Sequence, residues 1–376
     1  MNTRLTWMVA VLCIAGVASP VPAAQDEVAA AMTRHGIQPA ATASRANPRW
    51  RKPVKIVLLA WGQPWERVEE FRQRAAGANV VLATDIASAA AAAVDADIIM
   101  GRNPEICDAR IVDSAKQLRW LASLNAGVEL CMGLRAVKAQ NLVMTNMRGL
   151  DAPVIAEHAI ALMLALAHGL DRFAIDTSNR VWSRNSAARV PMQFLEGKTM
   201  LVSGLGGIGT EVARRAHGLG MRVVATRVGG SGKPDFVEHV GQPDELLTLA
   251  KTADVIVSAV PLTPQTTGMY DATFFAVLKP SAFFINIARG ASVDTGALMA
   301  ALNEGRLAGA GLDVVEPEPL PPDHPLWKSP RILFTPHISS ASDLPGDARW
   351  TIALENLRRY VAGEPLLNQV DLVRGF

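Results

Sequence analysis

A glycine-rich hexapeptide in the middle of the chain constrains the fold more than any other feature. It reads Gly204-Leu205-Gly206-Gly207-Ile208-Gly209, follows the apolar run 200–203 and opens a segment of helical character. In this context GxGxxG is typical of dinucleotide binding, because its glycines allow a tight turn, a close approach to a pyrophosphate and close packing of helix on strand. The helix N-terminus then faces the phosphate charge. The alternative is a glycine-rich turn without a ligand. The residues expected to line the site are Gly204, Gly206, Gly207, Ile208 and Gly209.

Apolar runs on both sides of the hexapeptide predict two series of alternating strands and helices. The first series has expected strands at 54–60, 80–82, 98–100 and 118–124, with helical stretches near 64–76 and 86–94. The second has expected strands at 200–203, 222–225, 255–257, 282–285 and 331–334. Strands that alternate with helices form a parallel sheet covered on both faces. The predicted fold class is therefore α/β, with two Rossmann/flavodoxin-like doubly wound parallel-sheet domains and a cleft between them.

A long apolar segment joins the two series. Asp151 suits a helix N-cap and Pro153 suits the first turn. The helix should run from 154 to about 170 and is apolar nearly all round, so we expect it to be buried between elements or between subunits. A last helix, about 347–361, follows the second series and can cross back to the first. The predicted organisation is a substrate-binding domain of residues 53–150 plus 338–376 and a dinucleotide-binding domain of residues 151–337.

The N-terminal segment has a different character. Arg4 precedes an apolar run from Leu5 to Ala18, and small residues follow. This pattern is typical of a secretory signal peptide, with an uncleaved anchor or a wrongly assigned start as the alternatives. Residues 1–24 are therefore expected to be a signal peptide or anchor, and the polar, Ala-rich residues 25–52 a linker. A periplasmic or exported location follows, or a cytoplasmic one if the start is wrong.

Composition argues against several kinds of site. The 376 residues are 49% hydrophobic and 19% charged with a net charge of +2, which allows large cores and offers no basic surface to nucleic acid. The three cysteines, Cys13, Cys107 and Cys131, form no CxxC pair and no Cys/His cluster, so no metal site is expected. Cys107 and Cys131 are interpreted as buried thiols in preference to a disulfide.

The residues after the second strand of the second series bear on the choice of dinucleotide. An Asp or Glu there would bind the ribose of NAD(H), but this chain has Thr226-Arg227, followed by glycines and Lys233. A guanidinium can hold a 2′-phosphate with two hydrogen bonds, whereas a carboxylate would repel it. We therefore predict that NADP(H) is favoured, with Thr226 and Arg227 in contact with it. The alternative is an exposed arginine, with NAD(H) held by the backbone.

Four segments after the hexapeptide and one before it form a recognisable set. They are PLTP at 261–264, INIARG at 285–290, GLDVVEPEP at 311–319, TPHISS at 335–340 and NAGV at 125–128. Together they resemble the D-isomer-specific 2-hydroxyacid dehydrogenase family, which includes glyoxylate/hydroxypyruvate reductases and phosphoglycerate dehydrogenases. The resemblance covers nearly all of residues 53–376. It implies nicotinamide-dependent hydride transfer to or from C2 of a small 2-keto or 2-hydroxy acid, and a homodimer.

Ketone reduction gives three side chains in these segments a chemical role. His337 can supply the proton that the developing alkoxide needs. Glu318 can favour the imidazolium and fix its orientation, and Arg289 can bind the substrate carboxylate and polarise the keto oxygen. Singly, each is more often a solvated or structural residue, but their joint occurrence behind a dinucleotide motif favours a site. By resemblance, Arg289, Glu318 and His337 are the family's catalytic residues.

Other residues of these segments complete the expected site. The substrate carboxylate should also meet the backbone N–H groups of Ala126, Gly127 and Val128. By resemblance, Asp313 contacts the nicotinamide end of the cofactor. The remaining expected cofactor contacts are Pro261, Thr266 and Ala288.

The set departs from the family pattern at two positions. Glu129 stands where Asp is frequent after the Gly-Val pair, and Ser339 where Gly is frequent after the catalytic histidine, so the natural acid is in doubt. Neither Tyr270 nor Tyr360 begins the Tyr-x-x-x-Lys of short-chain dehydrogenases. The competing function from another class is a dinucleotide-sensing binding module that resembles the C-terminal-binding corepressors.

Overall fold

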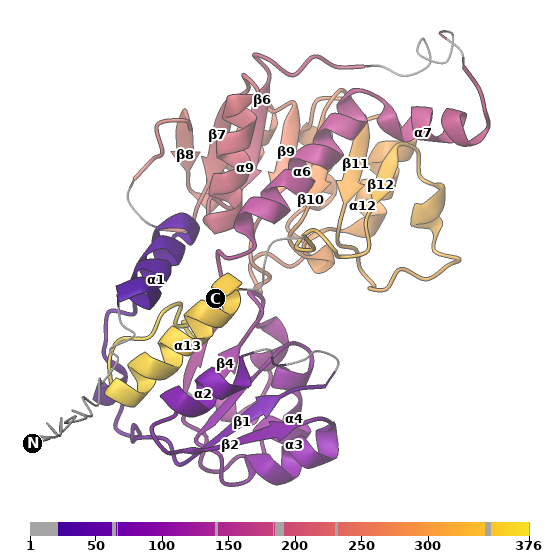
Figure 1. Cartoon of the computed structure of the whole chain (residues 1–376). Helices are drawn as coiled ribbons and strands as arrows, with labels where there is room; N and C mark the ends of the chain where they lie inside the picture. The colour runs from indigo at the N-terminus through magenta and orange to yellow at the C-terminus, as the bar shows by residue number, and fades with distance from the viewer. Residues whose placement is uncertain are drawn as a thin grey trace, which may run out of the picture.

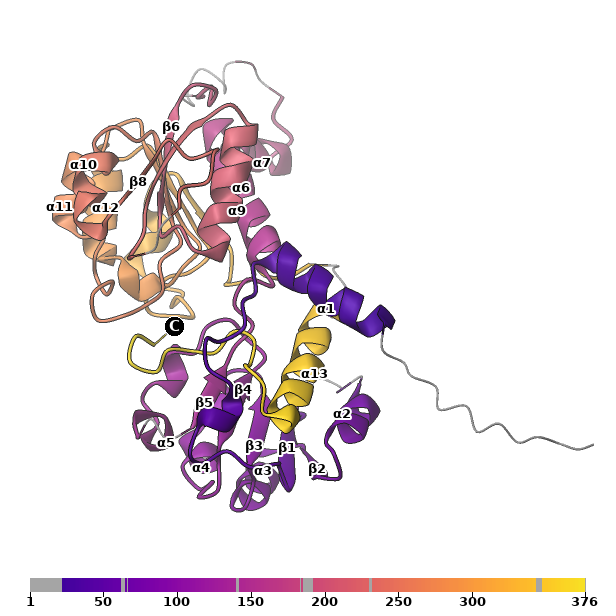
Figure 2. The same ribbon diagram turned by 90° about the vertical axis from the view of Figure 1, so that its left-hand side faces the viewer.

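The computed structural model describes residues 22–61, 65, 67–139, 142–182, 184, 192–229, 232–342 and 347–375. These residues form two α/β units, each built around one parallel sheet (Figures 1 and 2). The predicted fold class is confirmed. Residues 1–21 of the expected signal peptide or anchor lie outside the described residues.

The first unit has a five-stranded sheet whose order is β2-β1-β3-β4-β5. Its strands are β1 (Lys55–Leu59), β2 (Asn79–Ala83), β3 (Ile98–Gly101), β4 (Trp120–Ser123) and β5 (Val143–Thr145). Its connecting helices are α2 (Val68–Arg74), α3 (Ile86–Ala93), α4 (Ala109–Val112) and α5 (Arg135–Lys138). β3 and β4 are buried along their whole length, as expected for a parallel sheet covered on both faces.

The second unit has a seven-stranded sheet whose order is β12-β11-β10-β9-β6-β7-β8. Its strands are β6 (Thr199–Ser203), β7 (Arg222–Thr226), β8 (His239–Gly241), β9 (Val255–Ser258), β10 (Phe283–Asn286), β11 (Gly309–Leu312) and β12 (Ile332–Phe334). Its helices include α6 (Ala152–Ala167), α7 (Leu170–Ser178), α9 (Gly207–Gly218), α10 (Leu246–Ala250), α11 (Ala272–Val277) and α12 (Thr295–Asn303). The five expected strands of this series are all present, and β8 and β11 are two further strands that the sequence analysis did not predict.

Both sheets change direction next to their first strand. From β1 the chain adds β2 on one side and then returns to place β3 on the other, and from β6 it adds β7 and then places β9 opposite. Loops at the carboxyl ends of parallel strands diverge at such a switch point and leave a crevice where ligands bind. Each unit therefore has one topologically defined crevice, at β1/β3 and at β6/β9.

The C-terminal helix α13 (Asp347–Ala362) crosses back to the first unit, where it lies along the sheet (Figure 1). Leu354 and Leu357 are fully buried in one core with Ile56 and Leu58 of β1. At its start, Arg349 forms an ion pair with Asp151, which directly precedes α6, at 3.0 Å. Asp151 occupies the predicted N-cap position of α6, but its side chain makes no capping hydrogen bond.

Residues 25–52 are not a linker, which corrects the prediction. They contain most of helix α1 (Pro22–His35), which lies beside α13 in both views (Figures 1 and 2). Val28, Ala31 and Ile37 are buried, and the backbone N–H of Ala40 donates to Leu366 O at 2.7 Å. Alanine is a strong helix former, so a few apolar residues on one face suffice to dock an otherwise polar segment.

Helix α6 is buried as predicted, and elements of its own unit cover it. It packs on α9 and on the strands β10 and β11, and eight of its residues are buried. In the described part of the chain, no single helix is long and apolar enough to span a membrane. The pair α6 and α7 has that length only across a 73° bend.

Candidate active site

Three expected site residues follow the carboxyl ends of three neighbouring strands. Arg289 follows β10, Asp313 follows β11 and His337 lies three residues beyond β12, and these strands are adjacent in the order β12-β11-β10. Since parallel strands end at the same edge of a sheet, residues far apart in sequence meet there. The glycine turn after β6 lies on this edge as well.

His337 and Glu318 form a pair. His337 Nδ1 lies 2.9 Å from Glu318 Oε1, and the two side chains are 45% and 36% exposed. The backbone of His337 is left-handed, with φ of +53°, and its N–H donates to Asp313 O at 2.8 Å. Because a non-glycine residue rarely adopts this conformation, the bond to Asp313 helps to hold the turn that presents the imidazole.

The Asp313 side chain holds the His337 turn through hydrogen bonds to the residues that follow His337. Its carboxylate is 1% exposed and accepts hydrogen bonds from the Thr335 hydroxyl at 2.7 Å, the Ile338 N–H at 2.9 Å and the Ser339 N–H at 3.1 Å. Burial would raise the pKa of Asp313, but hydrogen bonds from Ser339 and Thr335 outweigh burial and lower it. Asp313 is therefore an anionic anchor for the His337 turn, and the contact with the nicotinamide end that the resemblance implies stays a prediction.

Arg289 reaches across to the first unit. Its Nη2 lies 3.1 Å from a carboxylate oxygen of Glu129, and its Nη1 donates to Ala288 O at 2.6 Å. A Cβ built on Gly127 would lie 2.1 Å from Arg289 Nη2, so only glycine allows the guanidinium to lie there. Buried Asn286 fixes the Arg289 turn, since it accepts from Ala288 N–H and donates to Arg289 O, both at 3.0 Å.

The loop that Arg289 contacts has free donors. No hydrogen bond from the backbone N–H groups of Ala126, Gly127 or Val128 occurs within the described part of the chain. Asn103 holds this loop from the end of β3, because its side chain donates to Gly127 O at 2.8 Å and its N–H donates to Asn125 Oδ1 at 2.8 Å. Successive free N–H groups beside a guanidinium form a site for an anion.

A disulfide lies next to this loop, and it corrects the prediction of two free thiols. Cys107 and Cys131 are bonded, with their Cα atoms 4.5 Å apart. Cys107 follows β3 and Cys131 lies just beyond Glu129, so the bond joins the two segments that flank the loop. Sequence spacing carried no signal for this bond, because the adjacency of β3 and β4 creates it.

The glycine turn has the geometry that a pyrophosphate requires. Gly204 has φ of +96°, and a Cβ there would lie 2.7 Å from Ala259 O. A Cβ on Gly209 would lie 2.0 Å from Gly204 O, so this glycine permits close packing of α9 on the turn. A Cβ on Gly206 would meet nothing within 4 Å, which leaves room for a ligand. The residues present fit a dinucleotide at the N-terminus of α9.

The other expected cofactor residues surround this turn on the same edge. Thr226 ends β7; its side chain is buried and its carbonyl accepts from Gly204 and Leu205. Arg227 follows it and donates to Gly232 O at 2.5 Å. After β9, the Thr266 hydroxyl donates to Pro261 O at 2.6 Å and closes the loop.

Some residues of the site were missed or undervalued in the sequence. His158 of α6 lies 2.8 Å from the Thr335 hydroxyl, which itself donates to Asp313. His158 therefore belongs to the hydrogen-bond network that supports the His337 turn. Asn103 and Asn286 were missed because each acts through backbone bonds in a loop, for which no short motif exists.

The fold and this edge define a dinucleotide-dependent oxidoreductase, in which the first α/β unit faces the second, cofactor-binding unit. The family model "D-isomer specific 2-hydroxyacid dehydrogenase, NAD binding domain" matches residues 160–339. The glyoxylate reductase of Thermococcus gammatolerans is 34% identical over 287 residues, which are 74% of this chain and 85% of that protein.

Two solved structures are similar to the whole fold, each with a TM-score of 0.72. One, a D-isomer specific 2-hydroxyacid dehydrogenase family protein from Aeromonas salmonicida, is 30% identical and covers 85% of this chain and 99% of its own. The other, a D-isomer specific 2-hydroxyacid dehydrogenase from Xanthobacter autotrophicus in complex with NADPH and MES, is 26% identical and covers 86% and 100%.

The chain belongs to the D-isomer-specific 2-hydroxyacid dehydrogenase family. It is an NAD(P)-dependent dehydrogenase that interconverts small 2-keto and 2-hydroxy acids. The predictions of family, enzyme class and nicotinamide cofactor are confirmed, and a binding module of the corepressor kind is not favoured.

Proposed function

We propose that this enzyme reduces a small 2-keto acid, of the glyoxylate or hydroxypyruvate kind, to the D-2-hydroxy acid, and that Arg289, Glu318 and His337 are its catalytic residues. One observation carries the proposal: the Arg289 guanidinium of the second unit lies against Gly127 of the first. A carboxylate bound there would meet this cation and the free N–H groups of residues 126–128. Similarity to a glyoxylate reductase supports the kind of acid.

His337 completes the proposed reaction. Its Nδ1 is engaged by Glu318, so Nε2 remains to face the substrate oxygen. When bound, the reduced nicotinamide supplies the hydride that C2 accepts. His337 gives its Nε2 proton to the former keto oxygen, so that C=O becomes CH–OH, and Glu318 stabilises the imidazolium before that transfer. Arg289 stabilises the negative charge that develops on the oxygen. In the oxidation direction the same groups act in reverse.

NADP(H) is the cofactor that this site favours under the proposal. Arg227 directly follows β7, where a ribose-binding carboxylate would stand in an NAD(H) enzyme. Its Nε is buried without a hydrogen-bond partner among the described residues, so this guanidinium has unused donor capacity. A 2′-phosphate would engage it with charge-assisted bonds. The NADPH bound by the Xanthobacter relative is consistent with this choice.

We also propose a homodimer. Large apolar side chains are exposed along α7 and the segments that follow it, and the most exposed are Leu170 (54%), Ile175 (53%), Trp182 (100%) and Phe194 (73%). Exposed apolar patches on a protein surface mark protein–protein contacts. Light scattering should give twice the chain mass for the wild type. Trp182→Glu should shift the protein towards monomer, and a monomeric wild type would refute the dimer.

The proposed location is an oxidising compartment outside the cytoplasm. The signal-like residues 1–24 predict export, and the Cys107–Cys131 disulfide supports it, since such bonds persist in oxidising compartments. N-terminal sequencing of the native protein should find a chain that starts near residue 25. A native chain that begins at Met1, with both thiols free, would contradict the proposal.

A panel of 2-keto acids tests the proposed activity. Glyoxylate, hydroxypyruvate and pyruvate are each mixed with NADPH or NADH, and the loss of absorbance at the nicotinamide band is followed. We expect turnover of glyoxylate and hydroxypyruvate with a preference for NADPH, and chiral analysis should find the D product from hydroxypyruvate. Tight dinucleotide binding without turnover of any 2-keto acid would favour the binding module instead.

A further inference from the structure

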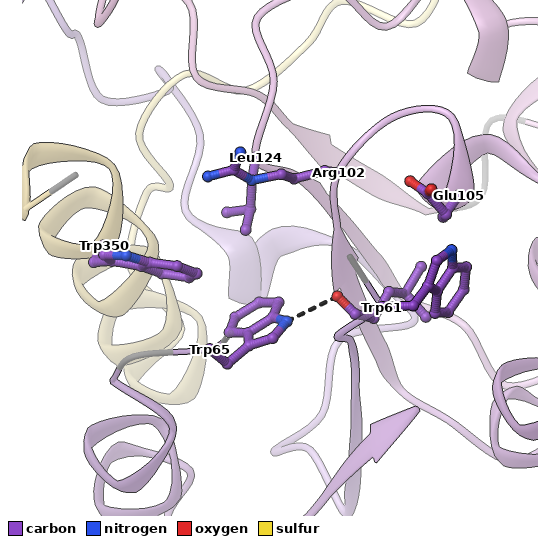
Figure 3. A pocket seen from close by; sticks show the side chains of 7 residues that line it. Trp61, Trp65, Arg102, Glu105, Leu124 and Trp350 are labelled. Carbon is purple, nitrogen blue, oxygen red and sulfur yellow. Dashed lines mark hydrogen bonds between the residues drawn. The ribbon is translucent and has the colours of Figure 1, made fainter. Parts of the chain in front are cut away.

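A hollow lined by three tryptophans lies at the carboxyl edge of the first sheet (Figure 3). The space between its walls, with the open solvent at the mouth included, is about 340 Å³. Its lining residues are Leu59, Trp61, Trp65, Arg102, Glu105, Leu124 and Trp350. Leu59 ends β1 and Arg102 follows β3, so the hollow straddles the β1/β3 switch point, where a doubly wound sheet binds its ligand.

Two residues that line the hollow directly precede residues of the proposed carboxylate site. Leu124 lines the hollow and is followed directly by Asn125 and the loop 126–128. Arg102 is followed directly by Asn103, whose side chain donates to Gly127 O at 2.8 Å. The two strand ends that support the carboxylate site therefore also form one wall of the hollow. A substrate held by its carboxylate at this loop has the hollow next to it.

Two of the tryptophans in the wall are held in place by contacts. The Trp65 indole N–H donates to Leu59 O at 2.8 Å, and its ring centroid lies 4.9 Å from that of Trp350 (Figure 3). Phe71 packs edge-on against Trp65 at 5.4 Å from behind. Aromatic side chains packed in this way keep one shape and favour contact with an apolar group.

Two charged residues, Arg102 and Glu105, also line the hollow, and the charge of Arg102 lacks a partner among the described residues. The side chain is half-buried, and it makes no hydrogen bond or ion pair within the described part of the chain. Burial lowers the pKa of Arg102, and the positive charge of nearby Arg349 lowers it further. Asp151 opposes this effect, but its carboxylate is already bound to Arg349. Glu105 lines the hollow without an ion pair to Arg102.

We propose that this hollow receives the side chain of the 2-keto acid, and that it selects an apolar stem ending in a second carboxylate. The tryptophans would contact the stem, and Arg102 would bind the distal carboxylate with charge-assisted hydrogen bonds. The substrate class is then a 2-keto dicarboxylic acid of the length of 2-oxoglutarate or 2-oxoadipate. This inference rests on the proposed function, because it needs the substrate carboxylate to be bound at residues 126–128. Glyoxylate has no side chain and would leave the hollow empty.

The test compares two acids of equal chain length. 2-Oxoglutarate and 2-oxovalerate differ only in the distal carboxylate, so the ratio of their kcat/KM values isolates the contribution of Arg102. We expect the wild type to prefer 2-oxoglutarate and Arg102→Gln to reduce the ratio about 10- to 100-fold, mainly through KM. Arg102→Lys should retain part of the preference. Arg72→Gln, on the exposed face of α2 in the same unit, is the matched control and should keep the wild-type ratio.

A second variant tests the apolar wall. Trp61→Ala should reduce kcat/KM for both five-carbon acids relative to glyoxylate, while the ratio between the two stays near the wild-type value. A wild type that prefers 2-oxovalerate, or an Arg102→Gln variant with an unchanged ratio, overturns this inference while glyoxylate turnover leaves the proposed function standing. If no 2-keto acid is reduced, glyoxylate included, the proposed function fails and this inference fails with it.

Discussion

The two α/β units present different chemistry at the same kind of switch point. At β6/β9 the second unit presents backbone: the turn from Gly204 to Gly209 leaves open space at Gly206 and a helix N-terminus behind it. At β1/β3 the first unit presents side chains, chiefly tryptophans and Arg102. Backbone contacts suit a ligand shared by many enzymes, whereas side chains suit one that differs between them. The comparison teaches that the cofactor site has a sequence signature because its geometry restricts which residues fit, and the substrate pocket has none.

The largest expected effect is on kcat, and it comes from removing His337, the proposed proton donor of the second unit. His337→Ala should lower kcat about 10²- to 10⁴-fold, because the proton for the alkoxide then has to come from water. The dissociation constant for NADPH, measured by fluorescence, should change little, since the glycine turn is untouched. His239→Gln, an exposed histidine paired with Glu245 in the same unit, serves as control. Activity close to wild type in His337→Ala would remove this residue from the mechanism.

The disulfide distinguishes the stabilities of the two units. Cys107→Ser should destabilise the first unit by about 3 kcal/mol, as expected for removing a cross-link across 24 residues. Urea unfolding followed by tryptophan fluorescence measures this loss, because Trp65, Trp120 and Trp350 lie in the first unit's core. Cys131→Ser should match it, and dithiothreitol should destabilise the wild type but neither variant. A wild type insensitive to dithiothreitol would contradict the structural role of the bond.

In the cofactor site of the second unit, which is otherwise formed mainly by backbone, the selection of NADP(H) is proposed to depend on the Arg227 side chain. Arg227→Asp should reduce the ratio of kcat/KM for NADPH over NADH about 10- to 100-fold, because a carboxylate repels the 2′-phosphate and binds the ribose. Steady-state kinetics with both cofactors measure the ratio. Arg222→Gln, at the amino end of the same strand, is the control and should leave it unchanged. An unchanged ratio in Arg227→Asp would mean that NADP(H) selection lies elsewhere.

The smallest expected effect concerns the contact between the units. Glu129 pairs with Arg289 at 3.1 Å and so competes with the substrate carboxylate. Glu129→Gln should lower KM for glyoxylate about two- to fivefold, in keeping with the modest strength of partly exposed ion pairs. Glu69→Gln on the exposed face of α2 should leave KM unchanged. A raised KM in Glu129→Gln would show that Glu129 positions Arg289 for the substrate.

Much of the fold could be predicted from local sequence because parallel strands are continuous apolar runs. The runs 200–203 and 282–285 fall on β6 and β10. The strand β8 was missed because His239–Gly241 has no apolar run and is defined only by its pairing with β7. The helix α1 was taken for a linker because it has few apolar residues, and the helix α13 that covers them lies far away in the sequence.

The candidate site could be predicted only where chemistry restricts residue type. Arg289, Glu318 and His337 stood out because proton transfer and carboxylate binding need those groups. The disulfide, the Asp313 anchor and the Asn103 bridge were not foreseen, because each depends on which loops the sheet order brings together. Asp151 illustrates the same limit, since the ion pair with Arg349 replaces the capping hydrogen bond that local sequence favoured.

The return of α13 to the first unit has a consequence for how the protein is made. The second unit is one continuous stretch of chain, and it can complete its core as soon as β12 has left the ribosome. The first unit has its sheet early but lacks Leu354, Leu357 and Tyr360, which fill that core, until the last residues are synthesised. The first unit therefore keeps apolar core surface exposed until α13 has been synthesised and has packed against its sheet.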